Sequence, residues 1–254
     1  MRDEVAAATA EGIAAQRAPH PVTVAWHGGE PLTTGVTRLE RLLAPFEPLR
    51  QEGMVTHALQ TNGTLINEPW CELIRRFDFR VGVSLDGPAA LNANRRDRRG
   101  SETFDRALRG IDRLKAAGID FIVIAVVSPE TIDRVDELLG FFEELGPSSL
   151  GINIEERENA NTGRPLISPK AAERFWHDVI VKLRGAPGSR YAKSATSPHS
   201  SPSDATVRST RRGPSSSCRP SPGKEMLSCS RQSLPALRPR NTATSSSETC
   251  SVRP

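Results

Sequence analysis

The chain has 254 residues and a formal net charge of +4, a length that suits one large domain or two small ones. Residues 194–254 contain nine Lys and Arg but three Asp and Glu, whereas residues 1–193 carry a net charge of −2. The high pI therefore comes from the C-terminal segment and does not indicate a nucleic-acid-binding domain. No apolar run approaches the ~18 residues of a membrane span, and acidic residues interrupt the Ala-rich N-terminus where a signal peptide would be apolar. We therefore expect a soluble cytoplasmic protein that binds neither nucleic acid nor membrane.

The composition changes abruptly near Gly185. Residues 194–254 contain 17 Ser, 8 Pro and few large apolar residues, so they cannot bury enough surface to offset an ordering entropy of roughly 1–2 kcal/mol per residue. We expect residues 185–254 to be a disordered tail. Two interpretations of it remain open: a native Ser/Pro/Arg-rich tail or linker, and the product of a shifted reading frame.

Residues 1–184 instead alternate between strand and helix patterns. The predicted strands are Val22–Trp26, Thr56–Gln60, Arg80–Leu85, Phe121–Val127 and Leu150–Glu155. The predicted helices are Met1–Gln16, Val36–Gln51 with a disturbance at Pro45 and Pro48, Glu68–Phe77, Thr103–Ala117, Ile132–Leu145 and Lys170–Leu183. The alternation predicts an α/β fold whose parallel sheet forms either a barrel or an open, doubly wound sheet. Because such folds normally begin with a strand, the leading helix suggests that the first strand is missing.

Three successive predicted strands end in unusual turns, WHGGEP, QTNG and SLDG. Ligands of parallel α/β folds gather where strands end. In the first turn, Gly28 and Gly29 let a ligand approach the backbone, and Glu30 adds a carboxylate suited to an ammonium group. The alternative for this turn is a tight connection with an acid that caps the next helix.

The two later turns add amides, a hydroxyl and a second carboxylate. Gln60 and Asn62 supply amide groups at the mouth of the sheet, Ser84 supplies a hydroxyl, and Asp86 supplies a carboxylate. The alternatives are a left-handed turn residue at Asn62 and an Asx turn at Asp86. Each turn alone is a weak signal, but three in succession predict one shared site.

The motifs WHGGEPL, LQTNGTLI and VGVSLDGP, in this order and spacing, resemble those of the radical S-adenosylmethionine (SAM) enzymes. The most similar subgroup is that of the anaerobic sulfatase-maturating enzymes and related peptide-modifying maturases, which often carry a C-terminal SPASM extension. The segment NRRDRRG at residues 94–100, followed by TFD, is similar to the loop that these maturases place after their SLDGP turn. The resemblance covers about residues 1–183.

The resemblance implies a partial, TIM-like (β/α)6 barrel, here lacking its first strand, that holds SAM and a [4Fe-4S] cluster. One electron from the cluster cleaves SAM, and the resulting 5′-deoxyadenosyl radical abstracts hydrogen from a peptide or protein substrate. An electron donor such as ferredoxin or flavodoxin is also implied. The residues that the resemblance assigns to the cofactor site are Gly28, Gly29 and Glu30 at the SAM amino group, Ser84 and Arg95 near its carboxylate or ribose, and Gln60, Asn62 and Asp86 at the mouth. After the last strand, Glu155 or Glu156 is a candidate to face substrate.

The cysteines depart from the family pattern. The family holds its cluster with a Cys-x3-Cys-x2-Cys loop after the first strand, whereas the first cysteine here is Cys71. We expect the chain to start inside the family's reading frame, with Met1 an internal methionine. Cys71 is expected to be a small buried apolar residue, and Cys218, Cys229 and Cys250 are spaced too widely for a SPASM cluster site.

No metal ligand or catalytic residue is therefore predicted, and we expect the chain as written to be inactive as a radical SAM maturase. One alternative is a non-catalytic pseudoenzyme that binds a peptide or protein partner on the barrel face. Another is an ordinary β/α enzyme that uses these carboxylates for acid–base chemistry. Against the latter, no His–acid or Lys–acid pair stands out in the sequence.

Overall fold

Five parallel strands form the centre of the fold, in a computed structural model that describes residues 1–156, 163–185 and 206–208. The strands pair in chain order, each parallel to the next. They are β1 (Val22–Trp26), β2 (Val55–Thr61), β3 (Arg80–Ser84), β4 (Phe121–Val127) and β5 (Ser149–Ile154). The five predicted strands are thus confirmed, with bounds shifted by at most one residue. The described residues belong to the first of two compact units, Met1–Gly213; the second, Pro214–Pro254, lies outside them.

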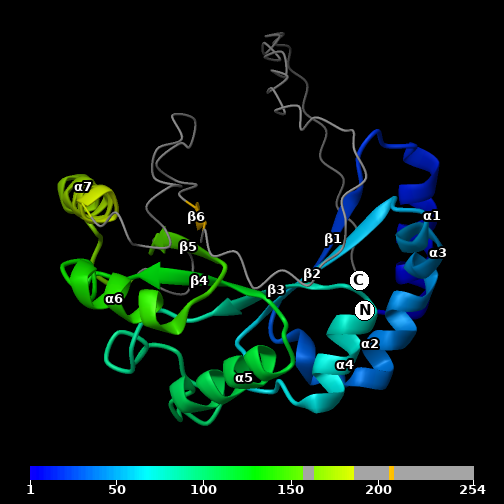
Figure 1. Cartoon of the computed structure of the whole chain (residues 1–254), viewed down its shortest axis with the longest axis horizontal. Coiled ribbons are helices and arrows are strands. Elements are labelled where there is room, and N and C mark those ends of the chain that lie inside the picture. Colours follow the sequence, from blue (N-terminus) through cyan, green and yellow to red (C-terminus); the bar gives the residue numbers. More distant parts are fainter. Residues whose placement is uncertain (157–162, 186–205, 209–254) are drawn as a thin grey trace, which may run out of the picture. The chain divides into compact units, whose positions relative to one another are not determined.

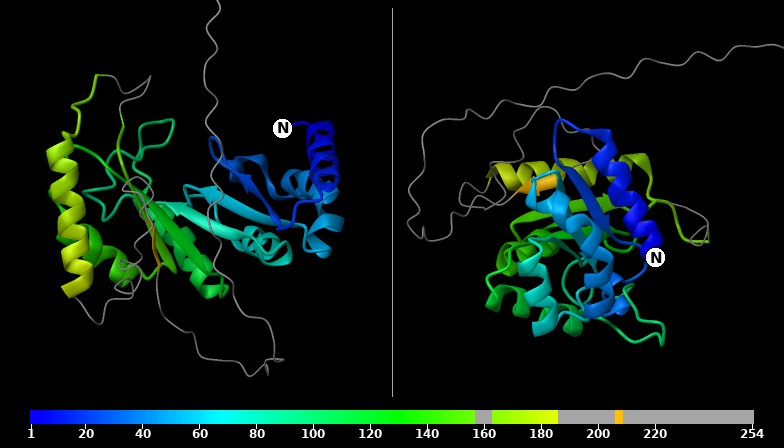
Figure 2. Two further views of the ribbon diagram at one scale, coloured as in Figure 1. Left: turned by 90° about the horizontal axis from the view of Figure 1, so that it is seen from above. Right: turned by 90° about the vertical axis from the view of Figure 1, so that its right-hand side faces the viewer.

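Seven helices accompany the strands in the described part of the chain. They are α1 (Asp3–Gln16), α2 (Val36–Leu43), α3 (Glu47–Gln51), α4 (Glu68–Arg76), α5 (Phe104–Ala116), α6 (Val135–Leu145) and α7 (Pro169–Gly185). The helices from α1 to α6 all lie on the convex side of the curved sheet (Figures 1 and 2). A doubly wound sheet carries helices on both faces, so the arrangement is that of a barrel segment. The prediction of a partial α/β barrel is confirmed.

Two predicted helices need correction. The segment 36–51 is not one helix, because a 3₁₀ turn at Ala44–Phe46 separates α2 from α3. Pro45 and Pro48 lack the N–H that a continuous helix needs, and the sequence located the disturbance at these residues. Helix α6 begins at Val135 rather than Ile132, because residues 129–133 form a turn in which Thr131 and Ile132 donate to the Ser128 carbonyl.

A sixth strand, β6 (Thr206–Arg208), pairs antiparallel with β5. It falls inside the segment that the sequence predicts to be disordered, and that prediction is corrected at these three residues. The outer edge of β5 offers backbone N–H and C=O groups that an extended segment can pair with, and Thr and Val favour extended conformations. Gly185, where the predicted tail begins, is instead the last residue of α7 (Pro169–Gly185), and the rest of the predicted tail lies outside the described residues.

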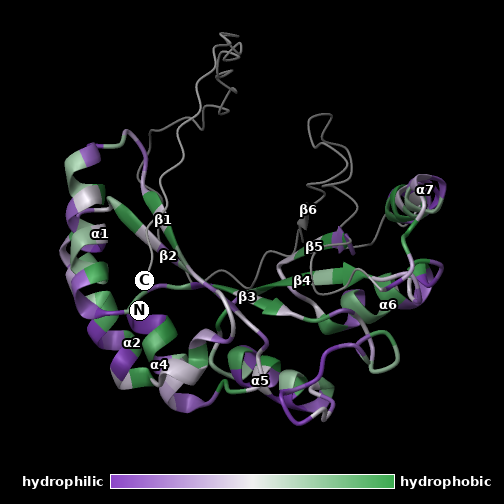
Figure 3. Ribbon diagram, turned by 180° about the vertical axis from the view of Figure 1, so that it is seen from behind, coloured by the Kyte–Doolittle hydropathy of each residue, from purple (hydrophilic) through white to green (hydrophobic). Residues whose placement is uncertain are grey.

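The core lies between the sheet and the helices on its convex side. Along β2, Val55, His57, Leu59 and Thr61 are buried on this side, while the alternating residues face the concave side and are half-buried. Figure 3 shows apolar residues concentrated in the strands and mixed character in the helices that cover them. None of the described helices is both long and apolar enough to cross a membrane. The half-buried side chains on the concave face of β2 lie outside this core.

Candidate functional site

The turns after β1, β2 and β3 meet at one edge of the sheet, because carboxyl ends of parallel strands lie together. In the first of them, Gly28 and Gly29 have φ angles of +95° and +67°. A Cβ atom added at either glycine would meet no atom within 4 Å. The glycines are therefore needed for the backbone conformation of the turn, and they leave its N–H and C=O groups open to a ligand.

Glu30 joins the first turn to the second. One carboxylate oxygen accepts the backbone N–H of Asn62 at 2.7 Å, and the other accepts the Thr61 hydroxyl at 2.7 Å and the Leu32 N–H at 3.1 Å. A carboxylate offers about four lone-pair sites, so three are used within the chain and one is left for a ligand. Thr61 is a further candidate residue, to which the sequence analysis gave no role although it stands between Gln60 and Asn62 in the QTNG turn.

The Asn62 side chain stabilises its own turn. Its oxygen accepts the backbone N–H of Thr64 at 2.9 Å and the Thr64 hydroxyl at 2.7 Å. The left-handed residue of this turn is Gly63, with φ +75°, and not Asn62. The interpretation of Asn62 as a left-handed residue is therefore wrong, and the amide forms an Asx turn instead.

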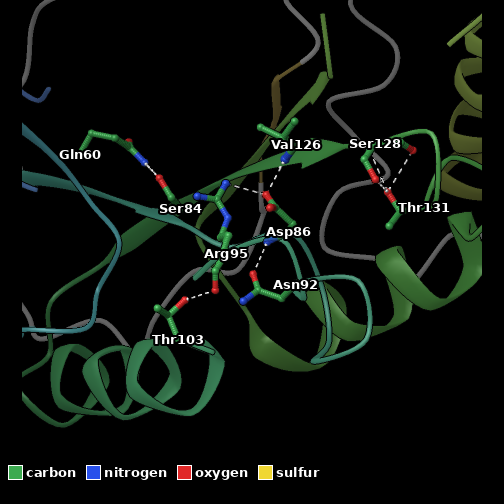
Figure 4. A network of polar contacts seen from close by, with 9 residues as sticks. All are labelled: Gln60, Ser84, Asp86, Asn92, Arg95, Thr103, Val126, Ser128 and Thr131. Carbon is green, nitrogen blue, oxygen red and sulfur yellow. Dashed lines mark hydrogen bonds and ion pairs between the residues drawn. The ribbon is translucent and has the colours of Figure 1, made fainter. Parts of the chain in front are cut away.

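Gln60 and Ser84 are brought together on the concave face. The Gln60 Nε2 donates to Ser84 Oγ at 2.8 Å, from β2 to β3 (Figure 4). Gln60 and Gly82 line a cavity of about 950 Å³ on this face, which extends to the amino ends of the strands at Asp78 and Ser148. The strand-end residues Glu30, Ser84, Asp86 and Arg95 are not part of its lining. Gly82 is a second residue that the sequence analysis missed; the signal was a glycine in the middle of a strand.

Asp86 ties the loop after β3 to the end of β4. Its Oδ1 accepts from Arg95 Nη2 at 2.6 Å and from the Val126 N–H at 2.8 Å, and its own N–H donates to Asn92 Oδ1 at 3.0 Å (Figure 4). The Thr103 hydroxyl also donates to the Arg95 carbonyl at 2.9 Å. Asp86 thus accepts from a neighbouring strand, which differs from the Asx turn that was the alternative. The sequence analysis gave no role to Asn92, and it included Thr103 only as part of the TFD motif.

Arg95 keeps a donor that the described residues do not use. Its Nη2 is paired with Asp86, but its Nε is buried and has no hydrogen-bond partner among them. Leaving such a donor unpaired is unfavourable, so an anionic oxygen of a ligand would be stabilised here. The structure thus places all the predicted residues at one sheet edge: Gly28, Gly29, Glu30, Gln60, Asn62, Ser84, Asp86 and Arg95. The side chains of Asn62 and Asp86 form their hydrogen bonds mainly with other residues of the chain.

The ends of β4 and β5 carry a separate ionic network. Arg164 Nη2 lies 2.7 Å from a Glu130 oxygen, and Arg164 Nη1 lies 3.4 Å from Glu155. The Ser128 hydroxyl donates to Glu130 at 2.6 Å, and this bond is the main cause that lowers the pKa of the Glu130 carboxyl, with Arg164 contributing. Glu155 is therefore engaged with Arg164, while Glu156 is exposed.

The described residues do not fit a [4Fe-4S] cluster. No group of three or more His, Cys, Asp or Glu side chains in that part of the chain could hold a metal. Cys71, in α4, is fully buried, and burial raises the pKa of its thiol, so it is the small buried residue that the sequence predicts. Cys218, Cys229 and Cys250 lie outside the described residues.

Comparisons with known proteins agree with the motifs. The family model of the radical SAM superfamily matches residues 2–142, more than half of the chain. The chain is 43% identical over 121 residues to the serine-type anaerobic sulfatase-maturating enzyme of Klebsiella aerogenes, covering 46% of this chain and 30% of that protein. It is 33% identical over 146 residues to the cysteine-type enzyme of Clostridium perfringens, covering 57% of this chain and 39% of that protein.

The fold agrees as well. A solved structure described as native anSMEcpe with bound AdoMet and Cp18Cys peptide is 28% identical, with a TM-score of 0.64. The match covers 73% of this chain and 53% of that chain. The chain thus spans less than half the length of the two curated relatives and about half of the solved one. From its family match, its strand-end motifs and its fold, the chain belongs to the radical SAM superfamily and is similar to the anaerobic sulfatase-maturating enzymes.

Proposed function

We propose that the strand-end site binds SAM, and that the chain corresponds to the SAM-binding part of a maturase that modifies a peptide or protein side chain. The observation that carries the proposal is the convergence of the Gly28-Gly29-Glu30 turn, the Gln60–Ser84 pair and the Asp86–Arg95 pair at one sheet edge. The bound AdoMet and peptide of the solved relative support it by similarity.

The amino-acid end of SAM is a zwitterion, which needs acceptors for its ammonium group and donors for its carboxylate. The open backbone of Gly28 and Gly29 and the unused lone pair of Glu30 suit the ammonium group. The hydroxyl of Ser84 and the unpaired Nε of Arg95 suit the carboxylate, because charge-assisted hydrogen bonds to a carboxylate are strong.

Gln60, Asn62 and Asp86 act on the ligand through their neighbours. Gln60 orients Ser84, Asn62 shapes the QTNG turn, and Asp86 orients Arg95. In a radical SAM enzyme, SAM supplies the radical that abstracts hydrogen from the substrate. The residues described above bind and orient SAM for that chemistry.

We propose that this chain by itself binds SAM but does not cleave it. The four cysteines of the sequence do not have the Cys-x3-Cys-x2-Cys spacing that holds the family's cluster, and Cys71, which lies within the described residues, is buried in α4. The proposed partners are a peptide or protein substrate and, for a cleavage-competent reaction, an electron donor such as ferredoxin or flavodoxin. The cytoplasmic location remains a prediction.

The test combines binding with reconstitution. The purified 254-residue chain is incubated anaerobically with iron and sulfide, and SAM retention, iron content and 5′-deoxyadenosine release after reduction are measured. We expect SAM to be retained, with iron and 5′-deoxyadenosine at the level of a protein-free control. Ser84→Ala should weaken SAM retention, whereas Ser101→Ala, in an exposed loop, should not.

Two results would contradict the proposal in different ways. Failure of the folded wild-type chain to retain SAM would remove the binding function. About four irons per chain together with 5′-deoxyadenosine would show that the chain holds a cluster after all.

A second candidate function is non-catalytic binding of a peptide or protein partner on the concave face. The observation in its favour is the cavity of about 950 Å³, whose wall includes the apolar residues Ile122 and Ile124. Peptide binding that persists in the absence of SAM and is lost in Ile122→Asp would support this function. Peptide binding that requires SAM would favour the maturase.

A further inference from the structure

We propose that Gly82 is a positioning residue of this site, and that its missing side chain directs the Ser84 hydroxyl to a ligand carboxylate. The inference rests on the proposed function, since the ligand in question is SAM. Its new element is a residue in the middle of β3 that offers no functional group of its own.

Gly82 stands directly opposite Gln60 in the sheet. The two residues are register partners between β3 and β2, and both line the cavity on the concave face. A Cβ atom at position 82 would lie 2.1 Å from Gln60 Oε1 and 3.1 Å from Gln60 Cδ. The Gln60 carboxamide therefore occupies the space that a side chain at position 82 would fill.

The requirement for glycine here is one of space. Gly82 is not among the glycines with positive φ angles, so its backbone conformation is open to alanine. The colliding atoms are the far end of the flexible Gln60 side chain. An alanine would therefore displace the Gln60 carboxamide without forcing the strand apart.

The position of Gln60 in turn determines what Ser84 can do. The Gln60 side chain reaches from β2 to β3, where its Nε2 donates to Ser84 Oγ at 2.8 Å (Figure 4). A serine hydroxyl has one hydrogen to donate and two lone pairs. Because Gln60 uses a lone pair, the hydroxyl hydrogen is left to donate, and no acceptor within the described ranges takes it.

The chemistry of the neighbouring donor indicates the acceptor. Arg95 lies along the same sheet edge, with a buried Nε that has no partner among the described residues. A hydroxyl and a guanidinium N–H that both lack an acceptor are suited to the two oxygens of one carboxylate. Displacing Gln60 would release the Ser84 hydroxyl from this orientation.

The test measures the affinity of the folded chain for SAM and for decarboxylated SAM, which lacks only the carboxylate. The variants are Gly82→Ala, Gln60→Ala and the double variant, with Gly140→Ala in α6 as control, since a Cβ at position 140 meets nothing within 4 Å. We expect Gly82→Ala to weaken SAM binding about tenfold, as loss of one oriented hydrogen bond would. Its affinity for decarboxylated SAM should be unchanged.

The double variant separates positioning from packing. When Gln60 is already alanine, there is no carboxamide to displace, so adding Gly82→Ala should change neither affinity. If Gly82→Ala fails to fold but the double variant folds, the close approach is supported, and Gln60→Ala should by itself weaken binding of SAM but not of decarboxylated SAM.

Several outcomes would overturn the inference. They are unchanged SAM affinity in folded Gly82→Ala, an equal loss for both ligands, an equal loss with and without Gln60, and failure of both the single and the double variant to fold. If the wild-type chain retains SAM and Gly82→Ala gives one of these results, this inference is refuted and the proposed function is not. A folded wild-type chain that retains no SAM refutes the proposed function and this inference with it.

Discussion

The Glu30 carboxylate accepts the backbone N–H of Asn62 at 2.7 Å, so an acid after β1 holds the turn that follows β2. The same carboxylate accepts the Thr61 hydroxyl at 2.7 Å. Two of the strand-end motifs are thus one physical unit. The glycines of the first turn can keep an open conformation because Glu30 fixes the end of that turn to the neighbouring strand.

Replacing Glu30 should therefore cost stability as well as any ligand binding. We expect Glu30→Ala to lower the free energy of unfolding by about 1–3 kcal/mol, since the Asn62 N–H and the Thr61 hydroxyl both lose their acceptor. Urea unfolding at pH 7 measures the change. Glu30→Gln keeps one acceptor oxygen and should cost less, and Glu11→Ala on the exposed side of α1 should be close to neutral. Equal stability of Glu30→Ala and wild type would show that these bonds contribute nothing net.

The QTNG turn is also held from the side of α5. A Cβ atom at Gly110 would lie 2.0 Å from the carbonyl oxygen of Gly63, so helix and turn are in contact through backbone atoms. Unlike the side chain opposite Gly82, a backbone carbonyl cannot rotate away. Arg113 adds a hydrogen bond to the Ile66 carbonyl at 2.6 Å.

We expect Gly110→Ala to lower the free energy of unfolding by about 1–3 kcal/mol, the usual cost of forcing an extra carbon into a packed contact. The matched control is Gly140→Ala, which also lies inside a helix but in open space. Gly140→Ala should be more stable than the wild-type chain by about 0.5–1 kcal/mol, because alanine favours the helix more than glycine does. Thermal or urea unfolding of the two variants checks the pair, and a similar shift in both would refute the contact.

The sequence was sufficient for the order of elements and for the sheet edge at which the candidate residues meet. Strand patterns that alternate with helix patterns predicted all five parallel strands, and the motifs at the ends of the first three contained Glu30, Gln60, Ser84 and Asp86. What the sequence could not provide was the register between strands. The contact of Gln60 with Gly82 depends on which residues of β2 and β3 stand opposite each other, and periodicity within one strand does not fix this.

Hydrogen-bond partners that lie far apart in the sequence were missed for a related reason. The bond from Val126 to Asp86 spans 40 residues, and nothing in the local pattern around Asp86 distinguishes it from a local turn. The strand β6 was missed because a three-residue strand has no period to detect. Its pairing depends on an edge that exists only once β5 is folded.

The burial of Cys71 leads to a chemical prediction. Burial raises the pKa of its thiol, with Glu68 adding to the shift, and the thiolate is the form that alkylating reagents attack. Cys71 should therefore resist iodoacetamide in the native chain and react only after unfolding, which mass spectrometry of its peptide would follow. Cys71→Ala should also leave the iron content after reconstitution unchanged. Rapid labelling in the native chain, or loss of iron in the variant, would contradict the buried assignment.

His57 lies on the core side of β2 and is fully buried. Its Nδ1 accepts from Trp26 Nε1 at 3.2 Å, and the rings of Phe46 and Phe79 lie 5.9 and 5.3 Å from its own. Since Nδ1 is the acceptor, the neutral ring carries its hydrogen on Nε2, which has no partner among the described residues. The site is therefore built for an uncharged imidazole.

Burial lowers the pKa of His57 to about 4, with Arg50 adding to the shift and Glu47 opposing it. In the unfolded chain the pKa is about 6.5, so between about pH 6.5 and 4 the unfolded state binds the extra proton. The free energy of unfolding should therefore be highest above pH 6.5 and fall by about 3 kcal/mol as the pH drops to 4. Urea unfolding at pH 7, 5.5 and 4.5 measures the free energy of unfolding. In His57→Phe, its decrease over this pH range should lack the part that His57 contributes in the wild type. His20→Gln, at an exposed position, should keep the wild-type dependence. An identical dependence in His57→Phe and wild type would mean that protonation of His57 does not oppose the fold.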